Sequence, residues 1–242
     1  MRRVLAVLVT GVTVVAIGCS SRYDKRMDLT LAEMQYNKRL DDNLKPAPAE
    51  GKLKDLQVYI RPPQPMVEAK EFGLGVLPTG LYDVEKTFYD ADKSALHVIA
   101  RVKTPKKAPA KGAAPAEPPA PRGAFNSDVL GTLKAVYGDD DSISLDKFKD
   151  DSHKPLIRGS ENKFRRAVFP ANNKTVEVYF FTADTYNVAM IFVYNTADRN
   201  AIVSKINLCL ESFATGNRAR AKYSSGGSEE GAEESAGPGV AF

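Results

Sequence analysis

The chain has 242 residues, and its 34 basic and 30 acidic side chains give a formal net charge of +4. A balance this close to neutral gives no footprint for nucleic acid, which would need a clustered basic face, so nucleic acid is not an expected partner. The sequence holds only two histidines, His97 and His153, so any Ser-His-Asp or Cys-His catalytic arrangement has to use one of them.

Residues 1–18 have the layout of a secretory signal, with Arg2 and Arg3 followed by the uncharged segment VLAVLVTGVTVVAIG. This apolar segment is shorter than the roughly 20 residues that a helix needs to cross the hydrocarbon core of a bilayer. We therefore predict a signal peptide over 1–18 rather than a permanent transmembrane span.

The sequence Ala16-Ile17-Gly18-Cys19 resembles the lipobox of bacterial lipoproteins, although Leu is usual where Ala16 stands. The resemblance covers residues 1–21. It implies that the Cys19 thiol carries a diacylglyceryl group, that the chain is cut before Cys19, and that the new amine receives a fatty acid such as palmitate. The lipid bilayer would then be a partner through acylated Cys19, since two or more acyl chains anchor stably.

The residue after the cysteine bears on which membrane holds the protein. In the lipoprotein pattern an Asp at this position retains the protein at the inner membrane, so Ser20 favours a location at the outer membrane, facing the periplasm. An ordinary cleaved signal with an incidental cysteine is the alternative.

Residues 19–51 are predicted to form a lipidated tether and an amphipathic helix. Thr30 and Glu33 have the spacing of a capping box, and Pro46 is expected to stop the helix. The apolar side chains that form one stripe, at spacings of three and four, are Leu29, Ala32, Tyr36, Leu40 and Leu44. Two alternatives remain open: a solvated spacer or a helix docked on the folded body.

We predict a single α+β domain over 52–216. Its expected first strand is 56–61, and 84–89 and 94–103 form a hairpin in which His97 is a structural residue on the face opposite Leu96 and Val98. The Pro-, Ala- and Lys-rich segment 104–123 cannot bury enough apolar area to fold, so we predict a disordered insertion. The alternative is a linker between two domains.

After the insertion, residues 125–138 are predicted to be a helix with Ser127 as its N-cap, and 163–170, 175–182 and 187–195 an antiparallel meander. A final helix is expected from Thr196 to Gly216, burying Ile202, Ile206, Cys209 and Phe213. The tail 217–242 is rich in Gly, Ser and Glu and is predicted to be disordered.

The last two predicted strands carry apolar residues on both faces, which indicates that something covers each side of the sheet. The face with Tyr179 and Phe181 has to be covered by the helix around Val129, Leu133 and Val136, by the N-terminal helix, or by a partner. The expected fold is therefore an antiparallel sheet sandwiched between helices. Residues 163–214 resemble the Mog1/PsbP-like α/β/α sandwich proteins, a resemblance that implies a binding or assembly role.

No catalytic or cofactor-binding motif is present, and Cys209 on its apolar helical face is expected to be a buried, inert thiol. The acidic segment 139–151 contains weak candidates for calcium ligands, Asp139, Asp141 and Asp150, but it lacks the Gly and Glu of an EF-hand loop, so a solvated loop is expected. We therefore predict a non-catalytic binding or assembly module of the cell envelope, with an envelope protein or wall polymer as its partner. The alternatives are an envelope hydrolase using His153 and a nearby Asp, and a structural spacer contacting anionic wall polymer.

Overall fold

The core of the molecule is a seven-stranded antiparallel sheet with the strand order β2-β3-β4-β8-β7-β6-β5. The computed structural model describes residues 2–75, 80–91, 94–103, 124–138, 143–155, 159–183 and 185–224, with side chains from residue 23 onward. The strands of this sheet are β2 (Val67–Glu68), β3 (Val84–Asp90), β4 (Ser94–Val102), β5 (Lys149–His153), β6 (Asn162–Ala171), β7 (Lys174–Thr182) and β8 (Tyr186–Asn195).

A separate two-stranded sheet joins the beginning and the end of the folded body, because β1 (Val58–Tyr59) pairs with β9 (Ala214–Thr215). The predicted strand 56–61 therefore exists only as this short pair and lies outside the main sheet. The helices and helical turns are α1 (Arg2–Asn43), α2 (Lys52–Asp55), α3 (Phe125–Tyr137), η1 (Leu145–Lys147), η2 (Thr196–Asp198), α4 (Arg199–Ser212) and α5 (Gly216–Ser224).

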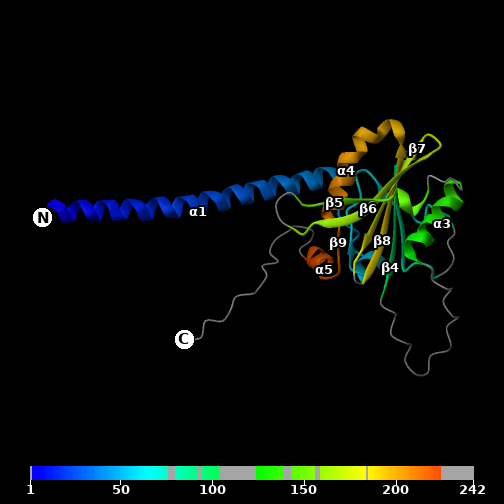
Figure 1. The fold of residues 1–242 in the computed structure, drawn as a ribbon, viewed down its shortest axis with the longest axis horizontal. Helices are drawn as coiled ribbons and strands as arrows, with labels where there is room; N and C mark the ends of the chain where they lie inside the picture. Colours follow the sequence, from blue (N-terminus) through cyan, green and yellow to red (C-terminus); the bar gives the residue numbers. More distant parts are fainter. Residues whose placement is uncertain are drawn as a thin grey trace, which may run out of the picture.

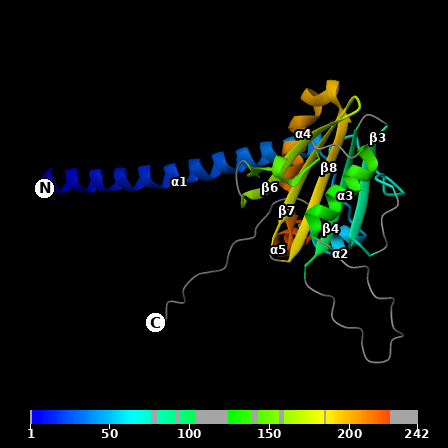
Figure 2. The same cartoon turned by 45° about the vertical axis from the view of Figure 1, so that its right-hand side comes forward.

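Helices cover both faces of the sheet, which confirms the predicted α+β sandwich. Figures 1 and 2 show α3 on one side of the sheet, and α4 with the end of α1 on the other. Leu133 of α3 packs with Val178 and Phe180 in one apolar core, whereas Ile206 of α4 packs with Tyr179 in the other. Strands β7 and β8 are apolar on both faces because both faces are buried. If one face were in water, polar residues would alternate with apolar ones along each strand.

The face with Tyr179 and Phe181 is covered by the protein's own segments. Tyr179 is buried, and Phe181 is half-buried between the rings of Phe164 and Phe213, with ring centroids 5.8 and 4.9 Å away. Of the covers considered from sequence, the N-terminal helix contributes to this core and α3 does not, since α3 lies on the opposite face. Helix α4 also contributes to this cover, through Ile202, Ile206 and Cys209.

The segments before and after residues 104–123 belong to one sheet. Strand β4 pairs with β8 from Ser94↔Tyr194 to Val102↔Tyr186. Helix α3 is also tied back to β4, because the Arg101 guanidinium donates to Asp128 at 2.6 Å and stacks over the rings of Tyr82 and Phe125. The predicted disordered insertion itself lies outside the described residues.

The C-terminal end of helix α1 is docked on the body, and the part before it is exposed. Tyr36, Leu40 and Leu44 are buried, and the Tyr36 hydroxyl donates to Glu211 of α4 at 3.1 Å. Residues 23–31 are exposed, including Leu29, the first residue of the predicted stripe, so the docked alternative holds for the end of the helix and the solvated one for its earlier part. The predicted capping box is wrong: α1 continues through Thr30, whose hydroxyl donates to the Arg26 carbonyl one turn back instead.

Helix α3 occupies the predicted range, with Val129 and Leu133 buried as expected, but its N-cap and the rest of its buried face differ from the prediction. Ala124 takes the N-cap position in place of Ser127, and the helix starts at Phe125, whose buried ring packs edge-on against Tyr82 and Phe180. Leu130 is buried, whereas Val136 is 43% exposed. Gly138 ends the helix as predicted, with φ at 100°, a conformation that glycine adopts without strain.

The C-terminal part of the body corrects three predicted boundaries. The turn η2 occupies 196–198, so α4 starts at Arg199, and it stops at Ser212 because the chain turns into β9. The predicted buried stripe, from Ile202 to Phe213, is confirmed. Residues 216–224 form α5, with Ala219 buried, so order extends beyond residue 216 into the segment that was expected to be disordered. The rest of that tail lies outside the described residues.

Candidate functional site

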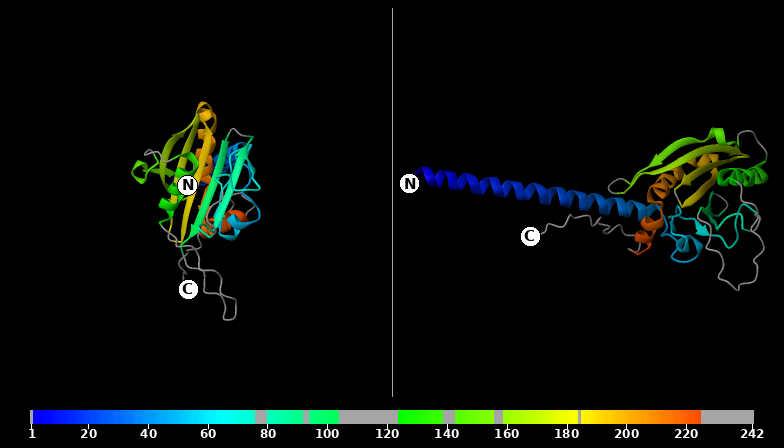
Figure 3. Two further views of the ribbon diagram at one scale, coloured as in Figure 1. Left: turned by 90° about the vertical axis from the view of Figure 1, so that its right-hand side faces the viewer. Right: turned by 60° about the horizontal axis from the view of Figure 1, so that its bottom comes forward.

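The predicted lipidation residue, Cys19, lies within the helical segment α1, and its side chain is outside the described part of the structure. At about 1.5 Å of rise per residue, Cys19 is about 25 Å along the helix axis from Tyr36, the first buried side chain in the part of α1 whose side chains are described. Figure 3 shows α1 extending away from the body, with its N-terminus far from the sheet. The geometry makes this segment a stalk between residue 19 and the sandwich.

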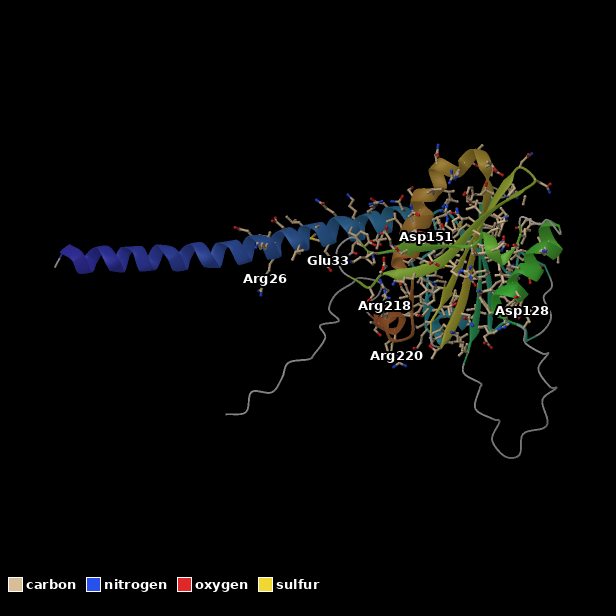
Figure 4. All side chains as sticks on the ribbon, viewed as in Figure 1. Arg26, Glu33, Asp128, Asp151, Arg218 and Arg220 are labelled. Carbon is tan, nitrogen blue, oxygen red and sulfur yellow. The ribbon has the colours of Figure 1, made fainter. Side chains whose placement is uncertain are left out.

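The stalk carries four apolar side chains on one face. Tyr23, Met27, Leu31 and Met34 are between 46 and 65% exposed. At 3.6 residues per turn they fall within about 80° of one another, on the side of the helix roughly opposite Tyr36. We call these four residues the stalk stripe. Figure 4 shows Arg26 and Glu33 on the same part of α1, where Arg26 is exposed and Glu33 half-buried.

The acidic segment does not assemble a metal site in the described residues. Asp150 lies in the edge strand β5, exposed and paired in register with Arg165, so it is not part of a calcium-binding loop. Asp139 and Asp141 lie outside the described residues. Within the described ranges there is no group of three or more His, Cys, Asp or Glu residues that could hold a metal ion.

The structure does bring His153 next to a carboxylate, as the hydrolase alternative requires. His153 Nε2 is 3.3 Å from Asp151 Oδ2, both residues being in β5. The His153 ring packs edge-on against Phe164 and Tyr179, and Asp151 lies 4.0 Å from Arg166 Nε. Asp151 is labelled in Figure 4, on the side of the body nearest the stalk.

Next to this pair, Glu177 is the centre of a buried polar cluster that was not foreseen from sequence. Glu177 is 1% exposed and accepts hydrogen bonds from Arg166 Nε at 2.6 Å, from the Tyr179 hydroxyl at 2.7 Å and from the Tyr194 hydroxyl at 2.9 Å. A second guanidinium nitrogen of Arg166 also contacts this carboxylate. The negative charge of Glu177 is thus compensated inside the core.

The chemistry of this cluster favours a structural role. Burial and the neighbouring Glu177 carboxylate raise the pKa of Tyr179 far above its ordinary value, and the same two causes raise the pKa of Tyr194 to about 12. Both hydroxyls therefore stay protonated and donate to Glu177. The hydrogen-bond partner of the His153 ring in the described part of the chain is Asp151.

Cys209 and His97 are both core residues, as predicted. Cys209 is fully buried, and burial raises the pKa of its thiol, which makes it inert. Burial lowers the pKa of His97 to about 4, and its Nδ1 lies 2.9 Å from the Thr87 hydroxyl. Neither residue is placed for catalysis.

Two hollows in the described part of the surface were not indicated by the sequence. One of about 730 Å³ lies along β5 and β6 and is lined by Asp150, Ser152 and Lys163 among others. The second, of about 370 Å³, lies between the end of α1, α2, β1 and α5, and we call it the α5 pocket. Its lining residues come from segments more than 160 positions apart, from Asn37 to Tyr223. No local sequence signal could have joined them.

No protein-family model and no curated protein matches the chain. Among solved structures, the cyanobacterial PsbP protein (CyanoP) of Synechocystis sp. PCC 6803 is similar over 69% of this chain and 91% of that chain, with 13% sequence identity and a TM-score of 0.37. This is a weak PsbP-like resemblance, and it carries no argument about function. Among the described residues, no helix is both long enough and apolar enough to cross a membrane.

Proposed function

We propose that this chain is a bacterial envelope lipoprotein, anchored to the membrane by acylated Cys19, that acts as a non-catalytic binding or assembly module. The signal-like residues 1–18 and the lipobox-like sequence before Cys19 support the anchor. Ser20 supports an outer-membrane location facing the periplasm. In this arrangement α1 holds the sandwich at a distance from the bilayer.

The observation that carries the binding role is the stalk stripe. Four adjacent apolar side chains, between 46 and 65% exposed, lie on the helix face that the protein's own core leaves uncovered. Contiguous exposed apolar surface of this kind marks protein interaction sites. We propose a protein of the same envelope as the partner, one that packs an apolar helix or groove along the stripe.

The anchor is tested by Cys19→Ala. We expect the variant to lose N-terminal acylation and to leave the membrane fraction, because a lipidated cysteine is the proposed attachment. Membrane fractionation with mass analysis of the N-terminus measures both. An unmodified Cys19 in the mature native protein would contradict the anchor.

The binding role is tested by Leu31→Glu in the stripe, with Leu29→Glu as a matched control. Leu29 is equally exposed, at 48% against 50%, but lies on another side of α1. We expect Leu31→Glu to dissociate the complex seen by native electrophoresis of gently solubilised membranes, while Leu29→Glu leaves it intact. Both variants should keep wild-type melting and membrane retention. A complex that survives Leu31→Glu would refute the role of the stripe.

The hydrolase alternative is supported by the 3.3 Å contact between His153 and Asp151. If it is correct, His153→Gln abolishes hydrolysis of an envelope-derived ester or amide and leaves the fold intact. The spacer alternative predicts instead that removing residues 104–123 abolishes co-sedimentation with isolated wall polymer. Neither result is expected for a module that binds through its stalk.

A further inference from the structure

The stalk stripe has the residue spacing of a coiled-coil seam. Met27 and Met34 are seven positions apart, so they occupy the same place in two successive heptads. Tyr23 lies four positions before Met27, and Leu31 lies four positions after it. With the two methionines at heptad position a, Tyr23 is at position d and Leu31 at position e. A seam of this kind fits another helix that lies along it.

The d position between the two methionines is Thr30, and it leaves no hydroxyl unpaired. The Thr30 hydroxyl donates to the Arg26 carbonyl of the same helix at 3.0 Å. Because this hydroxyl already has an acceptor, covering it with a partner costs little. The seam therefore runs without a break from Tyr23 to Met34, about 16 Å along the helix axis.

The charges beside the seam complement a second copy of the same helix. Glu33 is at position g, directly before Met34, and Lys38 is at the following position e. In a parallel pair of helices, a g residue of one helix lies beside the e residue five positions later in the other. Glu33 of each stalk would thus lie beside the partner's Lys38. Arg26, at the other g position, would lie beside the partner's Leu31 and cover it with its methylene stem.

The seam faces away from the body of its own chain. The stripe is roughly opposite Tyr36, which is buried and whose hydroxyl donates to Glu211 of α4. Figure 3 shows the stalk extending away from the body. Two stalks can therefore bring their seams together while each body stays on the outer side of the pair.

We propose that the partner of the stalk stripe is a second copy of this chain, and that the two stalks form a short parallel coiled coil. This inference rests on the anchor and on the stripe of the proposed function. The anchor sets the direction, because two chains held in one bilayer by Cys19 start at the same level. A seam of two heptads is short for association in free solution. Anchoring in one membrane raises the effective concentration of each stalk beside the other.

Cysteine cross-linking in membranes that contain the acylated full chain tests the pairing. In this chain Cys19 carries the lipid and Cys209 is fully buried, so an introduced cysteine is the reactive thiol. Tyr23→Cys and Met34→Cys place a thiol at each end of the stripe. Leu29→Cys is the matched control, because Leu29 is 48% exposed but lies on another side of α1.

Copper phenanthroline is the oxidant, and the yield of disulfide-linked dimer is read on a non-reducing gel. We expect each stripe variant to give at least about five times as much dimer as the control, because a disulfide forms only between residues whose Cα atoms are within about 7 Å. Equal linking at both ends of the stripe is expected of a parallel pair in register. In an antiparallel pair, like residues at the two ends cannot both meet.

Exchanging the charged residues tests the register in the Tyr23→Cys background. Glu33→Lys and Lys38→Glu each place like charges beside one another across the pair, and each is expected to lower the dimer yield about twofold or more. Together they restore opposite charges, so the combined variant should regain the yield of Tyr23→Cys alone. Each variant is expected to melt like the wild-type protein.

Three results would overturn the proposal. The first is a yield no higher for the stripe variants than for Leu29→Cys, as expected if another protein or the chain's own residues 225–242 cover the stripe. The second is linking at one end of the stripe alone, and the third is a combined charge exchange that does not regain the yield. Mass analysis of the N-terminus in the same membranes tests the anchor separately. A native complex that Leu31→Glu dissociates, without cross-linking between copies, would keep the binding role and reject the second copy.

Discussion

Replacing Glu177 by alanine tests whether the buried cluster acts as one unit. The change removes the common acceptor of Arg166, Tyr179 and Tyr194. Each tyrosine hydroxyl left without an acceptor in the core costs about 1 to 3 kcal/mol. The side chain of Arg166 is 33% exposed, so water compensates part of its loss. We therefore expect Glu177→Ala to lower the free energy of unfolding by about 3 to 5 kcal/mol.

The same reasoning predicts a change of sign when Tyr179→Phe is added. In the wild-type protein Tyr179→Phe removes one hydrogen bond to Glu177 and should cost about 1 to 2 kcal/mol. In the Glu177→Ala background the hydroxyl is already unpaired, so removing it should restore about 1 kcal/mol. The two substitutions are thus expected to couple by about 2 kcal/mol or more.

Urea denaturation followed by circular dichroism, on the full chain in nonionic detergent, measures all four free energies. Asp150→Ala is the control, because Asp150 is an exposed carboxylate on the neighbouring edge strand and should change stability by less than about 0.5 kcal/mol. Additivity of the two substitutions within about 0.5 kcal/mol would refute the view that Glu177 holds the cluster together.

Four further results are expected. Phe181→Ala should cost about 2 to 3 kcal/mol in a denaturant melt, because the ring is half-buried between two others; a loss below about 1 kcal/mol would place it on a partner-covered surface. Asn162→Ala should cost about 2 to 4 kcal/mol, since the buried Asn162 amide donates to the carbonyls of Leu210 and Phe213; a melt equal to wild type would contradict this. The folded-state pKa of His97, about 4, lies below its ordinary 6.5, so the unfolded chain binds the proton first and stability falls by about 2 kcal/mol from about pH 6.5 to pH 5; His97→Gln should lack this loss in melts at the two pH values. Trypsin should cut within 104–123 while the fragments co-elute, because β4 and β8 share one sheet; separated fragments would favour two domains.

The periodicity of apolar residues was sufficient for the central elements. The hairpin β3–β4 and the meander β6–β7–β8 lie where alternation placed them, and both faces of β7 and β8 are buried. The helical spacing also identified α4 and its stripe, including Ile206 and Cys209. These predictions succeed because an element that buries one face carries apolar residues at the period of that element, 2 for a strand and 3.6 for a helix.

Helix ends were predicted less well, because tertiary packing outweighs a cap of about 1 kcal/mol. Burial of Phe125 starts α3 before Ser127, and the return of the chain into β9 ends α4 at Ser212. Strand β5 was missed because its sequence, KDDSH, is polar on both sides, as an exposed edge strand can be.

The sequence by itself determined the anchor hypothesis at Cys19, the α+β class and the order of most elements, since each of these depends on residues close together in the chain. Only the tertiary structure placed Glu177 beside Arg166 and Tyr194, and brought Lys54 and Lys222 to the lining of one pocket. Contacts between segments that are far apart in the chain produce no regular residue spacing, so a single sequence does not predict them. They arise when the sheet and its covering helices pack, and this packing brings together the charges of the buried cluster and of the α5 pocket.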